Sequence, residues 1–137
     1  MNSFKKYICD TNILLSSLIS SSSPPAQTVD FIKDNGLFSF SKETFSEFEE
    51  VLKRPKFDKF LSKERRLNFI NKIFELSVFY EVHDKTDICR DPKDNKFLDI
   101  AIVSHAELLI TGDEDLLILE RIEKTSIITP RNFVDIL

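Results

Sequence analysis

Two acidic side chains stand where short apolar runs end, a placement that suggests chemistry as well as structure. Asp10 directly follows the run Tyr7–Cys9, and Asp113 follows the run Leu108–Thr111 after one glycine. Carboxylate oxygens are the ligands that Mg²⁺ and Mn²⁺ prefer. One or two such ions can activate water and offset negative charge during hydrolysis of a phosphodiester. Clustered acids would repel one another without a cation, so we expect a metal centre if the fold gathers them.

The elements that must position these acids alternate between strands and helices along the whole chain. Apolar runs predict about five short strands, over residues 7–9, 37–40, 78–82, 108–111 and 126–129. Helices are predicted over 12–18, 24–33, 42–53, 62–76, 95–105 and 132–137, with Ser41 as an N-cap but without a strict capping box. This alternation is typical of an α/β fold, here a three-layer α/β/α sandwich around a central, mainly parallel sheet. Ligands bind beyond the carboxyl ends of such strands, where Asp10 and Asp113 are predicted to lie.

Length and composition favour a single domain over residues 1–137. The chain is 42% hydrophobic with only two glycines and five prolines, which disfavours disordered and all-β classes. Its net charge of −4 excludes a simple basic nucleic-acid binder. Cys9 and Cys89 provide no disulfide framework or zinc pattern, and neither His83 nor His105 adds one. We find no signal peptide and no apolar run of membrane length, so we expect a cytoplasmic protein without membrane contact.

Four runs along the chain together resemble the acidic motifs of the PIN-domain family, in the same order and spacing. The run Cys9–Leu14 looks like the opening Asp-Thr-Asn signature at the end of the first strand. The run Ser41–Lys56 resembles the helix that carries an active-site glutamate. The runs Asp91–Leu98 and Leu109–Leu116 are similar to the third and fourth motifs. Each motif alone is weak, whereas four in order are fairly specific.

The resemblance implies that these motifs build one metal-dependent active site. Asp10, Asp94 and Asp113 would hold Mg²⁺ or Mn²⁺, and Glu47 would bind the ion or steer the attacking water. The catalytic residues are then Asp10, Glu47, Asp94 and Asp113. The side chains expected to orient them are Asn12, Thr111 and Asp99.

The activity implied by the resemblance is that of an endoribonuclease that hydrolyses RNA phosphodiester bonds. The subgroup that the motifs resemble most consists of toxin components of toxin–antitoxin pairs, which implies an antitoxin partner. PIN domains also often form homodimers, and the predicted helix over 62–76 could contribute such an interface. The preference for RNA over DNA comes from the family, because nothing in the sequence reads a 2′-hydroxyl.

Each acid also has a purely structural interpretation. Asp10 and Asp113 could cap the helices that follow them, the second of these over 114–118. Asp94 precedes the helix predicted over 95–105 and could cap it, while Asp91 would shape an Asp-Pro turn.

Helical periodicity does not distinguish Glu47 from Glu49. Both flank the apolar face formed by Phe45, Phe48 and Val51 when each residue advances by about 100°. Only the resemblance to the family selects Glu47.

The stretch over residues 53–66 contains seven basic side chains in an otherwise acidic chain. It could follow a phosphate backbone, with Arg54, Lys56 and Lys59 as the RNA-binding residues. The usual alternative is a solvated helix face. Phe57 and Phe60 could stack on bases if exposed, but core packing is the more common role.

Three other functions compete with a nuclease. A catalytically silent PIN-like binding or assembly module would need none of the acids, yet all four are present. A phosphotransferase with an Asp nucleophile typically needs a second acid two residues later, where this chain has Asn12. A nucleotide-binding protein needs a glycine-rich phosphate loop, and the only glycines are Gly36 and Gly112.

Overall fold

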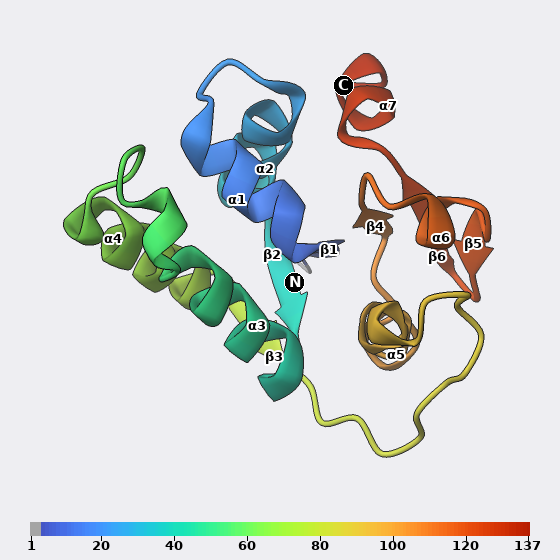
Figure 1. Ribbon diagram of the computed structural model, residues 1–137. Coiled ribbons are helices and arrows are strands. Elements are labelled where there is room, and N and C mark those ends of the chain that lie inside the picture. The colour runs from blue at the N-terminus through green and yellow to red at the C-terminus, as the bar shows by residue number, and fades with distance from the viewer. Residues whose placement is uncertain (1–3) are drawn as a thin grey trace.

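A mostly parallel sheet runs through the middle of the protein (Figure 1). The computed structural model describes residues 4–137. Within them six strands lie in the order β3-β2-β1-β4-β6-β5. All neighbouring pairs are parallel except β5 and β6. The strands are β1 (Lys5–Cys9), β2 (Gly36–Phe40), β3 (Ser77–Phe79), β4 (Leu108–Ile110), β5 (Arg121–Ile122) and β6 (Thr125–Ile128).

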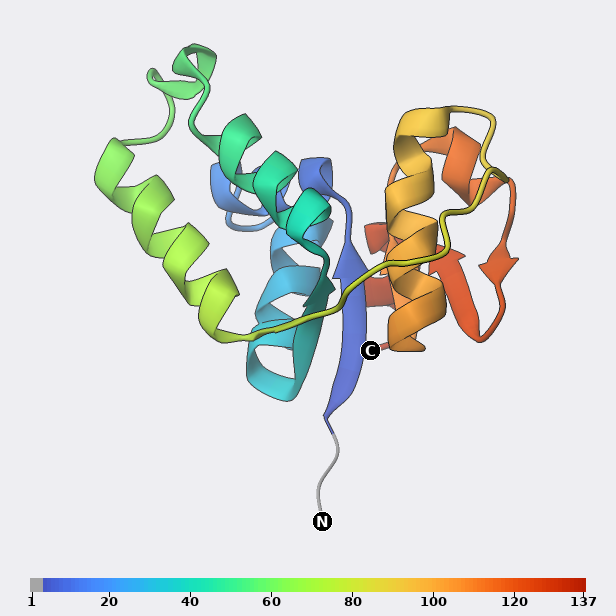
Figure 2. The same ribbon diagram turned by 90° about the horizontal axis from the view of Figure 1, so that it is seen from below.

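Helices cover both faces of this sheet, which confirms the predicted α/β/α layers. The helices are α1 (Thr11–Ile19), α2 (Pro24–Asn35), α3 (Lys42–Leu52), α4 (Lys63–Glu75), α5 (Asn95–Ser104), α6 (Glu114–Leu117) and α7 (Pro130–Asp135). Short 3₁₀ turns span Pro55–Phe57 and Pro92–Asp94. Figure 2 shows α3 and α4 on one side of β1 and α5 on the other. None of the helices in residues 4–137 combines the length and apolar character that a membrane crossing needs.

The central strand β1 divides the apolar interior into two cores, because its side chains alternate between the two faces. Tyr7 and Cys9 pack into the core beneath α1, α2, α3, α4 and α7. Ile8 packs into the second core, with side chains of α5 and α6. Both faces of β1 are therefore buried, as expected of a central parallel strand.

The chain reverses its direction of travel across the sheet between β1 and β4. After β1 it moves outward to β2 and β3, and it then crosses back to enter β4 on the other side of β1. The carboxyl ends of β1 and β4 are paired through Cys9 and Ile110. The amide of Asp10 extends this contact by donating to the Ile110 carbonyl at 3.1 Å. This is the topological switch point at which doubly wound sheets bind ligands.

The sequence placed the main helices and strands correctly, but three local features differ. Ser41 and Thr44 do form a capping box, because the Thr44 hydroxyl accepts from the Ser41 amide at 2.9 Å. The third strand ends at Phe79 rather than residue 82, after which residues 80–91 leave the sheet and cross to α5 (Figure 1). The structure has one strand that was not predicted, β5, because a strand of two residues is too short to show any periodicity.

A single methyl group at Gly36 should destabilise the sheet. A Cβ atom there would lie 2.7 Å from Cε2 of Tyr7 and 2.8 Å from the Lys5 carbonyl oxygen, where β1 and β2 pair. We expect Gly36→Ala to lower the free energy of unfolding by about 1–3 kcal/mol, measured by urea denaturation. Gly112→Ala is the matched control, because a Cβ there has no neighbour within 4 Å. Equal urea midpoints for the two variants would contradict this packing argument.

Candidate metal centre

Asp10 lies at the carboxyl end of β1 and is 7% exposed. Its Oδ1 accepts a hydrogen bond from the Ile13 amide at 2.9 Å, so the side chain caps α1. Its Oδ2 accepts from the hydroxyl of Thr111, which follows β4. Burial raises the pKa of Asp10 above its usual range, and the charges of Asp113 and Glu47 raise it further.

Thr111 connects Asp10 to Asp113 across the switch point. While its hydroxyl donates to Asp10, the same oxygen accepts from the Asp113 amide at 3.0 Å. The Asp113 carboxylate then caps α6 by accepting from the Asp115 amide at 2.9 Å. Both strand-end acids thus do act as helix caps, and the Thr111 hydroxyl connects them. The orienting role predicted for Thr111 stays a prediction, and its hydroxyl contacts both residues.

Asp94 differs from these two acids because its side chain does not cap a helix. It occupies the N-cap position of α5 but makes no capping hydrogen bond. Its Oδ2 atom is buried and has no hydrogen-bond partner in the described structure. Burial raises the pKa of Asp94 to about 7, together with the Asp113 carboxylate, which favours a shared proton between the two acids and repels a second negative charge. A buried carboxylate oxygen without a partner is costly, and a bound divalent cation would satisfy it, so the donor set fits Mg²⁺ or Mn²⁺.

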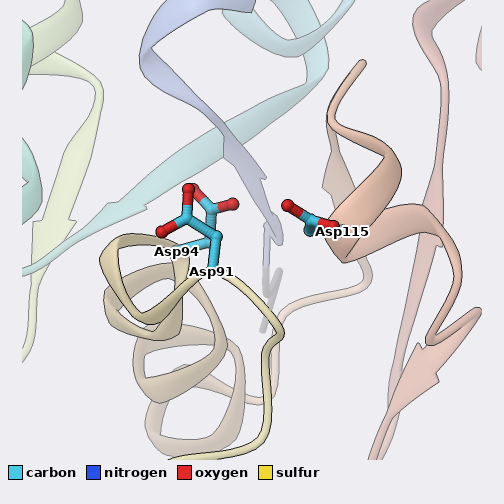
Figure 3. Close-up of side chains that lie close together, drawn as sticks. All are labelled: Asp91, Asp94 and Asp115. Atoms are coloured by element: carbon cyan, nitrogen blue, oxygen red, sulfur yellow. The ribbon is translucent and has the colours of Figure 1, made fainter.

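A second group of acids includes Asp94 and extends the centre to one side. Carboxylate oxygens of Asp91, Asp94 and Asp115 all lie within 4.8 Å of one another, and Figure 3 shows Asp91 and Asp94 facing Asp115 of α6. Asp91 shapes its turn as predicted, accepting from the Lys93 amide at 3.1 Å. Arg90 forms an ion pair with Asp115, with 2.9 Å between Nη2 and Oδ1. The ligand set predicted from sequence shares only Asp94 with this trio and stays a prediction.

Glu47 reaches the acidic region, whereas Glu49 points elsewhere. One Glu47 oxygen accepts from the Thr11 hydroxyl, and the other lies 3.0 Å from Nζ of Lys96. Glu49 makes only an exposed pair with Lys53 on its own helix, at 3.9 Å. Tertiary contacts therefore distinguish two positions that helical periodicity left equivalent.

Within residues 4–137, no side-chain hydrogen bond joins the other two predicted orienting residues to the predicted catalytic acids. Asn12 is exposed on α1, and the side chain that reaches Glu47 belongs to its neighbour Thr11. Asp99 is buried and accepts from the Thr86 amide at 2.7 Å, so it fastens the crossing segment 80–91 to α5. Thr11 and Lys96 lie within the first and third motif runs, but nothing in the sequence singled them out as site residues.

The basic stretch over residues 53–66 contains one side chain that cannot meet a ligand. Arg66 is 3% exposed, pairs with Asp58 at 2.7 Å and donates to the Leu52 carbonyl at 3.1 Å. Arg66 therefore holds the loop after α3. The predicted RNA-binding residues Arg54, Lys56 and Lys59 are all exposed, with Arg54 paired to Glu50 at 3.4 Å.

The chain is similar in sequence to a protein-family model and to one archaeal protein. The family model described as PIN domain matches residues 6–115. An uncharacterized protein of Methanocaldococcus jannaschii is 30% identical over 140 residues, covering 95% of this chain and 90% of that protein.

Two solved structures share the fold. PAE2754 from Pyrobaculum aerophilum has a TM-score of 0.63 at 16% identity, covering 96% of this chain and 88% of that one. VapBC2 from Rickettsia felis, solved bound to a DNA fragment from its promoter, has a TM-score of 0.58 at 14% identity, covering 90% and 98%.

The metal-free protein should lose stability as pH rises from 5 to 8. Folded Asp94 has a pKa of about 7, whereas an unfolded Asp titrates near about 3.9. Between these values the folded state holds the extra proton, so raising the pH removes stability. We expect the unfolding midpoint in EDTA to fall more steeply with pH for the wild type than for Asp94→Asn, whose side chain cannot ionise.

Thermal unfolding followed from pH 5 to 8 measures this difference, with Asp135→Asn on the exposed end of α7 as the control. At pH 8, Mn²⁺ should raise the midpoint of the wild type more than that of Asp94→Asn. Parallel pH curves for the wild type and Asp94→Asn would contradict the raised pKa of Asp94 in the folded protein.

Proposed function

Because this chain belongs to the PIN-domain family, we propose that it is a metal-dependent endoribonuclease that hydrolyses RNA phosphodiester bonds. The observation that carries the proposal is the buried oxygen of Asp94, which has no hydrogen-bond partner and lies beside Asp113. Several acids lie together at this switch point although their burial and mutual repulsion are unfavourable, and a divalent cation would offset both effects.

The proposed ligands of Mg²⁺ or Mn²⁺ are Asp10, Asp94 and Asp113, with Asp91 and Asp115 beside them. When bound, the ion would neutralise charge on the phosphate and lower the pKa of water at the site. Asp10 is held at both oxygens, by the Ile13 amide and the Thr111 hydroxyl, and Asp113 is held at one oxygen by the Asp115 amide, so both carboxylates are fixed in direction. Glu47 is proposed to orient the attacking water, because its carboxylate is held near the acids.

We propose a role as the toxin of a toxin–antitoxin pair, acting in the cytoplasm. Support comes from the family and from the shared fold with VapBC2, whose structure includes promoter DNA. An antitoxin protein would then be a partner, and homodimerisation through α4 would be a further property. The exposed side chains of Arg54, Lys56 and Lys59 are the proposed contacts to RNA phosphates.

Cleavage of RNA should require both the divalent ion and Asp10. We expect purified protein to cut mixed single-stranded RNAs in Mn²⁺ or Mg²⁺ and to be inactive in EDTA. Asp10→Asn removes one ligand charge and should lower the cleavage rate by at least about 100-fold, measured on end-labelled RNA by gel electrophoresis. Asp30→Asn, an exposed acid on α2, should retain the wild-type rate. Metal binding without cleavage of RNA or DNA would favour a silent binding module. Absence of both metal binding and cleavage would refute the proposal.

Production of the chain in a bacterial host should slow growth if the toxin role holds. Translation would fall because cellular RNA is cut, so we expect induced cultures of the wild type to stop dividing while Asp10→Asn cultures grow normally. The measurement is colony formation after induction, with protein levels matched by immunoblot. Equal growth of both cultures at matched levels would rule out a general RNA-cleaving toxin.

A further inference from the structure

The Glu47 carboxylate is held from two directions by side chains of other helices. Glu47 lies on α3, and neither of its contacts comes from that helix. The hydroxyl of Thr11 on α1 donates to Oε2, and Nζ of Lys96 on α5 lies 3.0 Å from Oε1. Both carboxylate oxygens therefore have a partner, and the side chain is fixed in a single direction.

Lys96 is in turn fixed by the turn that carries Asp94. Its ammonium also donates to the Lys93 carbonyl in the turn Pro92–Asp94 and lies 5.2 Å from the centre of the Phe97 ring. The Lys96 side chain is only 14% exposed. The position of Glu47 is thereby tied to the same short turn that places Asp94, although α3 and α5 lie on opposite sides of β1 (Figure 2).

This pair is unlike the exposed ion pairs on the same surface. Glu49 and Lys53 lie one helical turn apart, 3.9 Å from each other, with 40% and 56% of their side chains exposed. Such surface pairs contribute little to stability and restrain little. The pair between Glu47 and Lys96 joins residues 49 apart in sequence, with Lys96 14% exposed and Glu47 34% exposed. Each partner also has a second contact, Thr11 for Glu47 and the Lys93 carbonyl for Lys96, so this pair restrains the direction of Glu47.

We propose that Lys96 is a positioning residue for the reaction, which with Thr11 clamps the Glu47 carboxylate and aims it at the acidic centre. The proposal rests on the proposed nuclease function, because it assigns Lys96 an action through Glu47. Lys96 also borders two surface grooves of about 330 and 400 Å³ that share Glu43, Lys85 and Asp99. A lysine there could instead contact a substrate phosphate directly, and the two roles predict different kinetics.

The test compares Lys96→Met, Lys96→Arg and Lys124→Met in the full chain. Methionine keeps the aliphatic body of the side chain but removes its charge and donors, whereas arginine keeps both. Lys124 is exposed in the turn between β5 and β6 and serves as the matched control. If Lys96→Met does not fold, as judged by its unfolding midpoint, Lys96→Gln takes its place. Rates are measured on RNA that the wild type cuts, at saturating Mn²⁺.

For a positioning role, we expect Lys96→Met to lower kcat by about 10–100-fold with KM nearly unchanged. Lys96→Arg should restore most of kcat, and Lys124→Met should match the wild type. A raised KM with normal kcat would overturn the proposal in favour of direct contact with RNA. Unchanged kcat and KM would also overturn it.

Crystal structures of the wild type, Lys96→Met and Lys96→Arg provide a readout that is independent of activity. We expect Glu47 to leave the Thr11 hydroxyl in Lys96→Met and to keep that contact in Lys96→Arg. If Glu47 stays in place without Lys96, the clamp is refuted whether or not the protein cuts RNA. If the wild type cuts nothing while Glu47 moves as expected, the nuclease assignment fails and the clamp stands.

Discussion

Parallel pairing of β1 with β4 at the centre of the sheet is the constraint on which the acidic centre depends. The register Cys9 with Ile110 fixes where both strands end, so Asp10 and Thr111 emerge side by side. Two cores, one on each face of β1, secure this register, because a slip by one residue would turn each apolar side chain of the strand to the opposite face. The stability of the hydrophobic interior thus supports the burial of carboxylates that would otherwise favour separation.

The acids of the centre fall into two kinds according to how their oxygens are used. Asp10 and Asp113 each use one oxygen to cap the following helix. Those hydrogen bonds fix each carboxylate in direction. Asp94 has no such bond, keeps a buried oxygen without a partner, and has a pKa raised to about 7. Capping and metal binding are therefore compatible roles for the first two acids, while Asp94 is the acid whose environment most requires an added cation.

Local sequence signals predicted the elements well, because each depends on neighbouring residues. The serine before α3, the proline pair that opens α2 and the apolar run of β1 each predicted a correct boundary. The predictions failed where long-range contacts decide the outcome. Residues 80–82 alternate like a strand, yet the chain leaves the sheet after Phe79, and the following segment is fastened to α5 through Asp99. The ion pairs of Asp115 with Arg90 and of Lys96 with Glu47 join residues distant in sequence, so no local sequence pattern predicts them.

Two basic side chains lie at the edge of the acidic centre, and each is paired with one acid. Arg90 pairs with Asp115 at 2.9 Å, and Lys96 pairs with Glu47 at 3.0 Å, so each cation compensates an acid at the edge of the cluster. Neither pair supplies a partner for the buried oxygen of Asp94 between them. In the metal-free protein a proton is the available substitute, which is the physical meaning of the raised pKa. A divalent ion would contact several carboxylates at once and displace that proton. Metal binding at Asp94 would therefore release a proton.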